Sequence, residues 1–277
     1  MPRSRRHRPT LDGFTVHREE KERREASPDR PLRILLINWM DMANPMAGGA
    51  EVHLTEIFRR FADRGDEVTM AVSDFRGGGR FDEYHGIDIV RRGTRETFNF
   101  VVPRLAQSLD RHHDFDVIVE DVNKIPFFTP LYLKKPLLVV VPHLFGDAVF
   151  RETNPAVASY VWLMERPIPL VYRHAEFEAI SGSTARDLEH RGIRPSRIHT
   201  VYCGMDHNRY TVDPVVKKFD QPTILYLGRV KRYKSVDVLV RAVPAVAAEI
   251  PDVRLAVVGS GDDLPRLRAL AGSLGIA

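Results

Sequence analysis

Residues 32–51 read LRILLINWMDMANPMAGGAE, and this stretch decides how the chain begins to fold. The apolar run Leu32 to Ile37 has the length of a buried strand. After Gly48 and Gly49, the apolar residues take helical spacing up to the stop at Gly65. From here to residue 201, short apolar runs alternate with amphipathic stretches. That alternation predicts a parallel sheet covered by helices, an α/β fold.

Two further apolar runs, 223–227 and 254–258, each lead directly into glycine. A helix is expected at Val236 to Glu249 and another at Leu264 to Leu274. The small and basic residues that follow the two runs are Gly228, Arg229, Lys234, Gly259 and Gly261. The second half of the chain therefore repeats the strand-then-helix pattern of the first half.

Three predicted strands run into glycine-containing segments, in the order Gly48-Gly49, Gly228-Arg229 and Gly259-Ser260-Gly261. This arrangement resembles that of glycosyltransferase family 4. The resemblance covers residues 32–277 and implies retaining enzymes with the GT-B architecture. The fold implied is α/β and GT-B-like, with one complete Rossmann-like doubly wound domain and the first half of a second. The expected parts are a charged, disordered arm (1–31), the acceptor-side domain (32–205), a linker (206–221) and an incomplete nucleotide-sugar-binding domain (222–277).

Members of that family carry, further along, paired glutamates at E-x7-E spacing that hold the donor, and this sequence contains no such segment. A doubly wound sheet uses about five or six strands, with the first in the middle, and the second half of this chain supplies two. We therefore expect the strand at 223–227 to lack a neighbour on one side. The resemblance thus implies a C-terminally truncated chain with impaired activity, marginal stability over residues 222–277 and weak nucleotide binding.

The composition excludes several classes of protein. Of 277 residues, 43% are hydrophobic and 28% charged, as is ordinary for a globular protein. The longest apolar run, Leu137 to Val141, is too short to span a membrane. A single cysteine, Cys203, excludes an internal disulfide, and the N-terminus lacks the apolar core of a signal peptide. We expect a cytoplasmic protein, peripheral at the inner face of the membrane where its acceptor is lipid-linked.

The basic charge is concentrated in the arm. The net charge is +4, and residues 1–30 hold nine Arg or Lys against six Asp or Glu. Because the rest is nearly neutral and lacks a basic stripe with interleaved aromatic residues, we expect no nucleic-acid partner. A disordered tail is the simpler interpretation of the arm. Weak contact with an anionic membrane is the alternative, blunted by the interspersed glutamates.

Gly48 and Gly49 are the first candidates for donor binding. Glycine lets the backbone approach a ligand closely, and the following helix offers N–H groups to a phosphate. A tight turn without a ligand is the simpler alternative, and Glu51 can complement the helix N-terminus. A dinucleotide-binding site, suggested by Asp74 at the end of a strand, is disfavoured because these glycines are adjacent and lie too far from the first strand for GxGxxG.

Arg229 and Lys234 are the strongest catalytic candidates. When a nucleotide-diphosphate sugar loses its sugar, charge grows on the diphosphate, and fixed cations stabilise it most in the transition state. The alternative is a solvated basic turn. Gly228, Gly259 and Gly261 end the two strands as donor-binding glycines do in the family.

Three residues of the first domain complete the candidate site. The resemblance places His143 near the transferred sugar, although an isolated histidine is more often structural. Asp121 and Asn123 end a strand where open α/β sheets bind ligands, so they are candidate acceptor contacts, or else a capped loop. Neither a metal site nor a cofactor is expected, because no Cys/His cluster or Asp-x-Asp motif has suitable spacing.

The function that the resemblance implies is transfer of a hexose from a nucleotide-diphosphate sugar to a hydroxyl of a lipid-linked or saccharide acceptor. Such a reaction would serve cell-envelope polysaccharide or glycolipid synthesis. Two alternatives remain open. One is a non-catalytic binding or regulatory remnant that partners a full-length transferase, and the other is a GT-B-fold epimerase.

Overall fold

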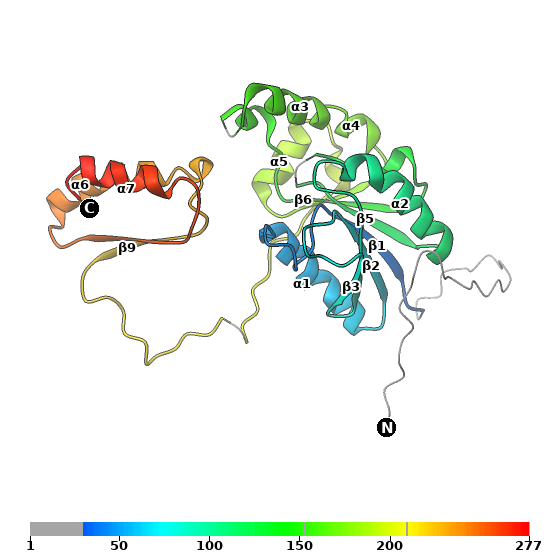
Figure 1. The fold of residues 1–277 in the computed structure, drawn as a ribbon, viewed down its shortest axis with the longest axis horizontal. Coiled ribbons are helices and arrows are strands. Elements are labelled where there is room, and N and C mark those ends of the chain that lie inside the picture. Colours follow the sequence, from blue (N-terminus) through cyan, green and yellow to red (C-terminus); the bar gives the residue numbers. More distant parts are fainter. Residues whose placement is uncertain (1–29, 124, 152, 209, 277) are drawn as a thin grey trace. The chain divides into compact units, whose positions relative to one another are not determined.

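The chain forms two units (Figure 1). The structure is a computed structural model that describes residues 30–276 apart from 124, 152 and 209. Unit 1 comprises the described residues up to Gly146 together with Ser159–Cys203, and unit 2 comprises Asp147–Ala158 and the residues from Gly204 onward. The expected arm and its membrane contact fall on residues 1–31, of which all but the last two lie outside the described residues.

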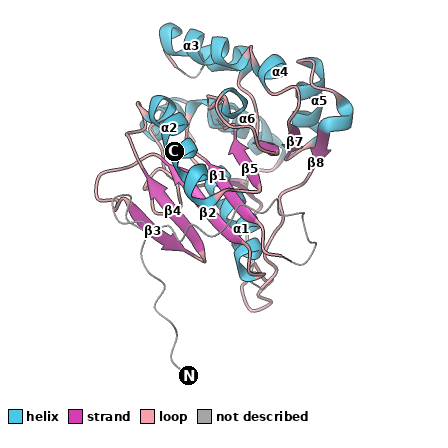
Figure 2. Cartoon of the chain, turned by 90° about the vertical axis from the view of Figure 1, so that its right-hand side faces the viewer, coloured by secondary structure: helices cyan, strands magenta, loops and turns pink. Residues whose placement is uncertain are grey.

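Within the described part of unit 1, eight strands form one sheet in the order β3-β4-β2-β1-β5-β6-β7-β8. All neighbours are parallel except β3 and β4, which are antiparallel. Figure 2 shows β4, β2, β1 and β5 running side by side. The strands are β1 (Arg33–Ile37), β2 (Glu67–Val72), β3 (Phe81–Tyr84), β4 (Ile87–Arg91), β5 (Val117–Asp121), β6 (Leu137–Val141), β7 (Glu176–Ala179) and β8 (Ile198–Thr200). The expected mainly parallel α/β domain is confirmed.

Helices cover both faces of this sheet, as the side chains of β1 record. Ile34 and Leu36 belong to the core cluster that contains the apolar residues of α1. Leu35 and Ile37 point the other way, into the cluster that contains α2. Since successive strand residues face opposite sides, an uninterrupted apolar run is what a strand buried on both faces requires. The helices of unit 1 are α1 (Gly49–Asp63), α2 (Phe98–His113), α4 (Ile168–Val171) and α5 (Gly182–His190), and α3 (Pro155–Glu165) begins in unit 2 and ends in unit 1.

The sequence pattern missed two edge strands, β3 and β8. β3 carries Asp82 and Glu83 and is mostly exposed, so it lacks the apolar run that marks a buried strand. Its pairing with β4 depends on the turn residues His85 and Gly86, both with positive φ (52° and 77°). Two central residues with positive φ match the right-handed twist of a hairpin.

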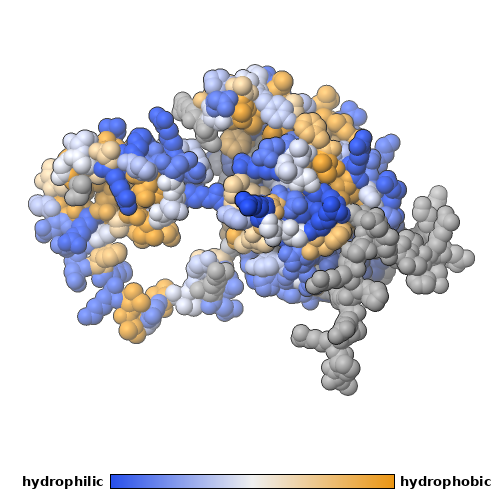
Figure 3. Space-filling model, in the orientation of Figure 1, coloured by the Kyte–Doolittle hydropathy of each residue, from blue (hydrophilic) through white to orange (hydrophobic). Residues whose placement is uncertain are grey.

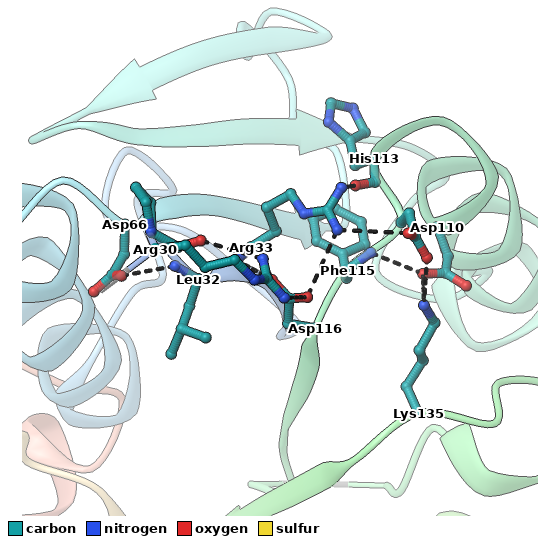
Figure 4. Close-up of polar contacts among 11 residues, drawn as sticks. Arg30, Leu32, Arg33, Asp66, Asp110, His113, Phe115, Asp116 and Lys135 are labelled. Carbon is teal, nitrogen blue, oxygen red and sulfur yellow. Dashed lines mark hydrogen bonds and ion pairs between the residues drawn. The ribbon is translucent and has the colours of Figure 1, made fainter. Parts of the chain in front are cut away.

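The amino ends of β1 and β5 are joined by a polar network (Figure 4). Asp116 accepts hydrogen bonds from Arg30 Nη1 at 3.0 Å and from the backbone N–H of Arg33 at 2.9 Å. Burial alone would raise the pKa of Asp116, but hydrogen bonds from Arg30 and Arg33 outweigh it and hold the value at about 2. Lys135 adds an ion pair to Asp114 at 2.8 Å. These ion pairs and hydrogen bonds stabilise the amino-terminal edge of the sheet.

In the described part of unit 2, β9 (Thr223–Leu227) and β10 (Arg254–Val258) form a two-stranded parallel sheet. Their bounds, and those of α6 (Val236–Glu249), are as the sequence predicts. α6 and α7 (Leu264–Ser273) pack on one face through Val236, Val240 and Leu267. The other face leaves 57% of Leu225 and 75% of Leu227 exposed. Hydrophobic surface is accordingly visible on the sheet side of this unit (Figure 3).

Candidate functional site

The candidate residues of unit 1 lie at the carboxyl edge of its sheet. Asn38 follows β1, Asp121 ends β5, and His143 comes two residues after β6. Because these strands are parallel, their carboxyl ends meet at one edge. The chain runs from β1 to β2 on one side and later reaches β5 on the other side of β1. The sheet order therefore reverses between β1 and β5, which is where open α/β sheets bind ligands.

Gly48 and Gly49 form the start of α1, on the loop that leaves β1. Gly48 is the N-cap, and its N–H donates to Glu51 Oε2 at 2.6 Å. Glu51 is 3% exposed, so this carboxylate serves the helix end, as the sequence suggested. The N–H groups of Gly49 and Ala50 have no acceptor within the helix, because no helical turn precedes them. A Cβ on Gly49 would meet nothing within 4 Å. The loop is thus open to a ligand at Gly49.

A buried ion pair, which the sequence analysis did not identify, fixes the loop after β1. Asp41 accepts hydrogen bonds from Arg91 Nε at 2.7 Å and Nη2 at 2.9 Å, and both side chains are 1% exposed. Arg91 also donates to the carbonyl of Gly79 at 2.9 Å. The hydrogen bond to Asp41 raises the pKa of Arg91, although burial opposes the rise. This pair ties the loop to the end of β4.

Asp121 and Asn123 form a polar cluster together with Asn38. Asn123 Nδ2 donates to Asp121 Oδ2 at 2.6 Å and to Asn38 Oδ1 at 3.2 Å. Asn38 and Asp121 are fully buried, and Asn123 is 8% exposed. Asn123 Oδ1 accepts no hydrogen bond from any described residue. The structure therefore brings the two candidate acceptor contacts together and adds Asn38. The signal for Asn38 was its place as the first polar residue after a buried strand.

Glu120, one residue earlier, shapes the loop behind this cluster. Its buried carboxylate accepts hydrogen bonds from the Tyr172 hydroxyl at 2.5 Å and from the N–H groups of Phe127 at 2.7 Å and Thr129 at 3.2 Å. Burial raises the pKa of Glu120, and the hydrogen bonds from Thr129 and Tyr172 oppose that rise. Glu120 positions the loop and does not reach its outer surface, because it is 0% exposed.

His143 is exposed, and a buried carboxylate fixes the loop that carries it. Its ring meets Phe145 edge-on, with centroids 4.9 Å apart. Glu165, buried at the end of α3, accepts hydrogen bonds from the N–H of Phe145 at 2.7 Å and of Gly146 at 2.9 Å. Arg191 neutralises Glu165 at 3.2 Å. The histidine therefore faces solvent on a loop that Glu165 fixes. No local sequence pattern indicated this role of Glu165.

In unit 2 the three candidate glycines pack the two strand ends against each other. A Cβ on Gly259 would lie 1.9 Å from the Gly228 carbonyl oxygen, and one on Gly261 would lie 1.9 Å from the Val230 oxygen. Gly228 and Gly259 also have positive φ, 154° and 148°. Backbone hydrogen bonds join the loops, from Gly228 N–H to Val258 at 3.0 Å and from Val230 N–H to Ser260 at 2.9 Å. These glycines have a packing role whether or not a ligand is bound.

Arg229 and Lys234 lie in the loop that these glycines fix. The Arg229 carbonyl accepts the Tyr226 hydroxyl at 2.8 Å, and both basic side chains belong to exposed residues. Lys234 Nζ lies 5.1 Å from the centroid of the Tyr233 ring. Lys231, in the same loop, pairs with Asp262 at 2.8 Å. The strand end therefore presents positive charge to solvent on a backbone that is tightly packed.

The described part of the chain offers neither a cluster of metal ligands nor a helix that could span a membrane. Within residues 30–276, less the three gaps, no group of three or more His, Cys, Asp or Glu side chains is arranged to hold a metal ion. In the same part of the chain, no helix combines the length and the apolar character that crossing a membrane requires.

Two family models match this chain, and together they cover most of unit 1 and, apart from Tyr210, all of unit 2. Residues 47–209 match Glycosyltransferase Family 4, and residues 211–277 match Glycosyl transferases group 1. The chain belongs to glycosyltransferase family 4.

Curated relatives of this family 4 member are mannosyltransferases. The GDP-mannose-dependent alpha-(1-6)-phosphatidylinositol monomannoside mannosyltransferase of Mycolicibacterium smegmatis is 26% identical over 253 residues, covering 84% of this chain and 63% of the relative. The enzyme of the same name from Mycobacterium tuberculosis is 33% identical over 82 residues, covering 27% of this chain and 21% of that protein. The chain thus spans less than two-thirds of the length of these relatives.

Solved structures with the same fold include several GT-B glycosyltransferases. Sucrose-phosphate synthase from Thermosynechococcus elongatus aligns with a TM-score of 0.65 at 16% identity, covering 89% of this chain and 68% of that one. HepE of Anabaena, solved in complex with UDP-glucose, aligns with a TM-score of 0.60 at 18% identity, covering 88% and 66%. At such identities the likeness establishes the fold, and the GT-B expectation is confirmed.

Proposed function

We propose that this protein transfers a hexose from a nucleotide-diphosphate sugar to a hydroxyl of a lipid-linked or saccharide acceptor, with retention of anomeric configuration. The observation that carries the proposal is the strand end of unit 2, where Arg229 follows a glycine packed against the neighbouring loop. Membership of glycosyltransferase family 4 supports it. Because the mycobacterial relatives are named for GDP-mannose, a mannosyl donor is the first to test.

In this proposal the residues of unit 2 act on the leaving group. Arg229 offers a planar fork of donors to phosphate oxygens, and Lys234 offers a point charge. Both stabilise the diphosphate as the glycosidic bond breaks, which lowers the barrier more than it tightens ground-state binding. Three glycines, Gly228, Gly259 and Gly261, allow the loop to pack closely against the strand ends. The backbone that carries the two basic side chains is therefore fixed in position.

The residues of unit 1 take the acceptor and the sugar. Asn123, which is 8% exposed and is held by the buried Asp121 and Asn38, offers its amide oxygen to an acceptor hydroxyl, and His143 faces the transferred sugar. The open N-terminus of α1 at Gly49 suits a phosphate-bearing part of either substrate. No metal or other cofactor is needed in this scheme, because fixed cations and a helix end take the place of a bound divalent ion.

The test is a transfer assay with GDP-mannose and UDP-glucose as donors, and with phosphatidylinositol monomannoside in vesicles and a soluble mannoside as acceptors. Arg229→Ala and Lys234→Ala are each expected to lower kcat by about 100-fold at saturating donor. Lys231→Ala is the matched control, because this lysine of the same loop pairs with Asp262. Retained kcat in either of these two variants would refute the leaving-group role.

The product distinguishes the alternatives. An α-linked product from an α-linked donor, detected by NMR and formed equally in EDTA, is expected for the proposed reaction. Conversion of the donor sugar to its epimer without an acceptor would indicate an epimerase instead. Nucleotide binding without turnover under any condition would indicate a binding protein.

A further inference from the structure

Three side chains that the proposed transfer reaction does not use meet in unit 1. His53 lies on α1, Glu178 on β7, and Cys203 follows β8. His53 Nε2 is 2.9 Å from Glu178 Oε1, and Cys203 Sγ is 3.6 Å from His53 Nδ1. These residues are 125 and 150 positions apart in sequence, so only the fold brings them together.

The geometry assigns a role to each atom. When Nε2–H donates to the Glu178 carboxylate, the neutral imidazole carries its lone pair on Nδ1, which faces the Cys203 thiol. The His53 and Glu178 side chains are only 10% and 9% exposed, so the pair is well shielded from water. Cys203 is exposed. A nucleophile in reach of a base that a third group orients is the arrangement of activated thiols and hydroxyls.

The arrangement does not suit metal binding. Sulfur and carboxylate lie at opposite nitrogens of one imidazole ring and therefore do not converge on a common point. Consistently, the described residues contain no group of His, Cys, Asp or Glu that could hold a metal ion. Proton transfer from the thiol to an imidazole that the carboxylate orients is the chemistry that these three groups can perform.

We propose that Cys203 is a modification site for soft electrophiles, with hydroperoxides as the reacting class, and that His53, oriented by Glu178, accepts the thiol proton. Sγ attacks the outer oxygen of the peroxide, the S–O bond forms as the O–O bond breaks, and the product is a sulfenic acid. The sulfur is oxidised by two electrons and the peroxide is reduced to an alcohol or to water. The proton held on His53 Nδ1 passes to the departing oxygen.

The chain supplies its own control pair. His199 Nε2 lies 2.9 Å from Glu176 Oε2, so it is also a histidine bound to a glutamate. Its side chain is 57% exposed, and that of its glutamate is 47% exposed. The sulfur of Cys203 contacts His53 and not His199 in the described hydrogen bonds. Removing His199 therefore changes the same kind of pair without removing the base from the thiol.

The experiment measures the rate of thiol reaction in the full chain. Cys203 is the single cysteine of the sequence, so intact-mass detection reports this site alone. Iodoacetamide probes nucleophilicity, and hydrogen peroxide with dimedone trapping probes sulfenic acid. Wild type, His53→Gln, Glu178→Gln and His199→Gln are compared at pH 7, with the urea-unfolded chain as reference and Cys203→Ser as blank. Circular dichroism checks the fold of each variant.

We expect wild type to react at least about tenfold faster than His53→Gln and the unfolded chain, as loss of a positioned general base predicts. Glu178→Gln is expected to react several-fold more slowly than wild type, and His199→Gln at the wild-type rate. The proposal is overturned if folded His53→Gln reacts like wild type, or if wild type reacts no faster than the unfolded chain. Should His53→Gln fail to fold, equal rates for Glu178→Gln and His199→Gln would overturn it.

Discussion

Replacing Gly259 by alanine should separate the two strand-end loops of unit 2. The new Cβ would lie 1.9 Å from the Gly228 carbonyl oxygen and 2.9 Å from its carbon, both backbone atoms that cannot rotate away. To restore ordinary contact, the loops must part by roughly 1.5 Å. The φ of 148° at this position adds strain for any residue with a side chain.

The expected magnitude follows from these contacts. Overpacking costs about 1–3 kcal/mol, and the loops lose part of two hydrogen bonds worth about 1 kcal/mol each. We therefore expect unit 2 to lose about 2–4 kcal/mol in free energy of unfolding. Gly272→Ala is the matched control, because its Cβ in α7 meets nothing within 4 Å. That change should be neutral or stabilise by about 0.5 kcal/mol.

Hydrogen exchange across residues 223–258 measures the effect where it arises. A loss of 2–4 kcal/mol corresponds to amide exchange faster by about 30-fold or more in β9 and β10, while exchange in unit 1 stays unchanged. Binding of GDP or UDP should weaken in parallel, because the displaced loop carries Arg229. Wild-type protection in Gly259→Ala would refute the reasoning, since the two loops would then tolerate a side chain that the structure excludes.

Three further predictions concern unit 1. Because the pKa of Asp116 is held at about 2, below its unfolded value, the stability that this carboxylate contributes is present above about pH 4 and is lost as the pH falls towards 2. Asp116→Asn should therefore lower the free energy of unfolding in urea by about 1–2 kcal/mol at pH 7, after discounting for partial exposure, and should not change it near pH 2. Asp114→Asn, with a side chain 72% exposed, is its control and should change stability little. Glu120→Gln should destabilise by about 1–3 kcal/mol, because the carboxylate accepts three buried donors, and an unchanged Tm would contradict this. His143→Ala should leave Tm unchanged and lower the transfer rate about tenfold or more, and equal rates would remove His143 from the site.

The elements that the sequence predicted well are those with strong local periodicity. β9, β10 and α6 begin and end where the apolar pattern places them, and α1 begins within one residue of the expected position. Each is specified by neighbours along the chain: a short apolar run for a buried strand, an amphipathic stretch for a helix, and glycine at the end. The exposed edge strand β3 had no such pattern, and a turn with two positive φ values produces it.

Polar pairs between residues far apart in the chain could not be predicted from the sequence, for a physical reason. Asp41 and Arg91 are 50 residues apart, and the imidazole of His53 meets a glutamate 125 residues away. A lone charged residue in a loop carries no mark of its partner, because ion pairs and hydrogen bonds form across whatever elements the packing brings together. The same holds for the contact of Gly259 with Gly228, which arises only when two parallel strands end side by side.

The sequence by itself determined the α/β class, the order of the elements and the types of residue at each strand end, because local periodicity and turn chemistry suffice for these. Only the tertiary structure decided which strand ends adjoin, and so that Asn38 joins Asp121 and Asn123 at the point where the sheet order reverses. It also decided that the thiol of Cys203 and the carboxylate of Glu178 both lie within contact distance of the His53 imidazole. These outcomes depend on distances between segments, which parallel strand pairing fixes and which no local pattern encodes.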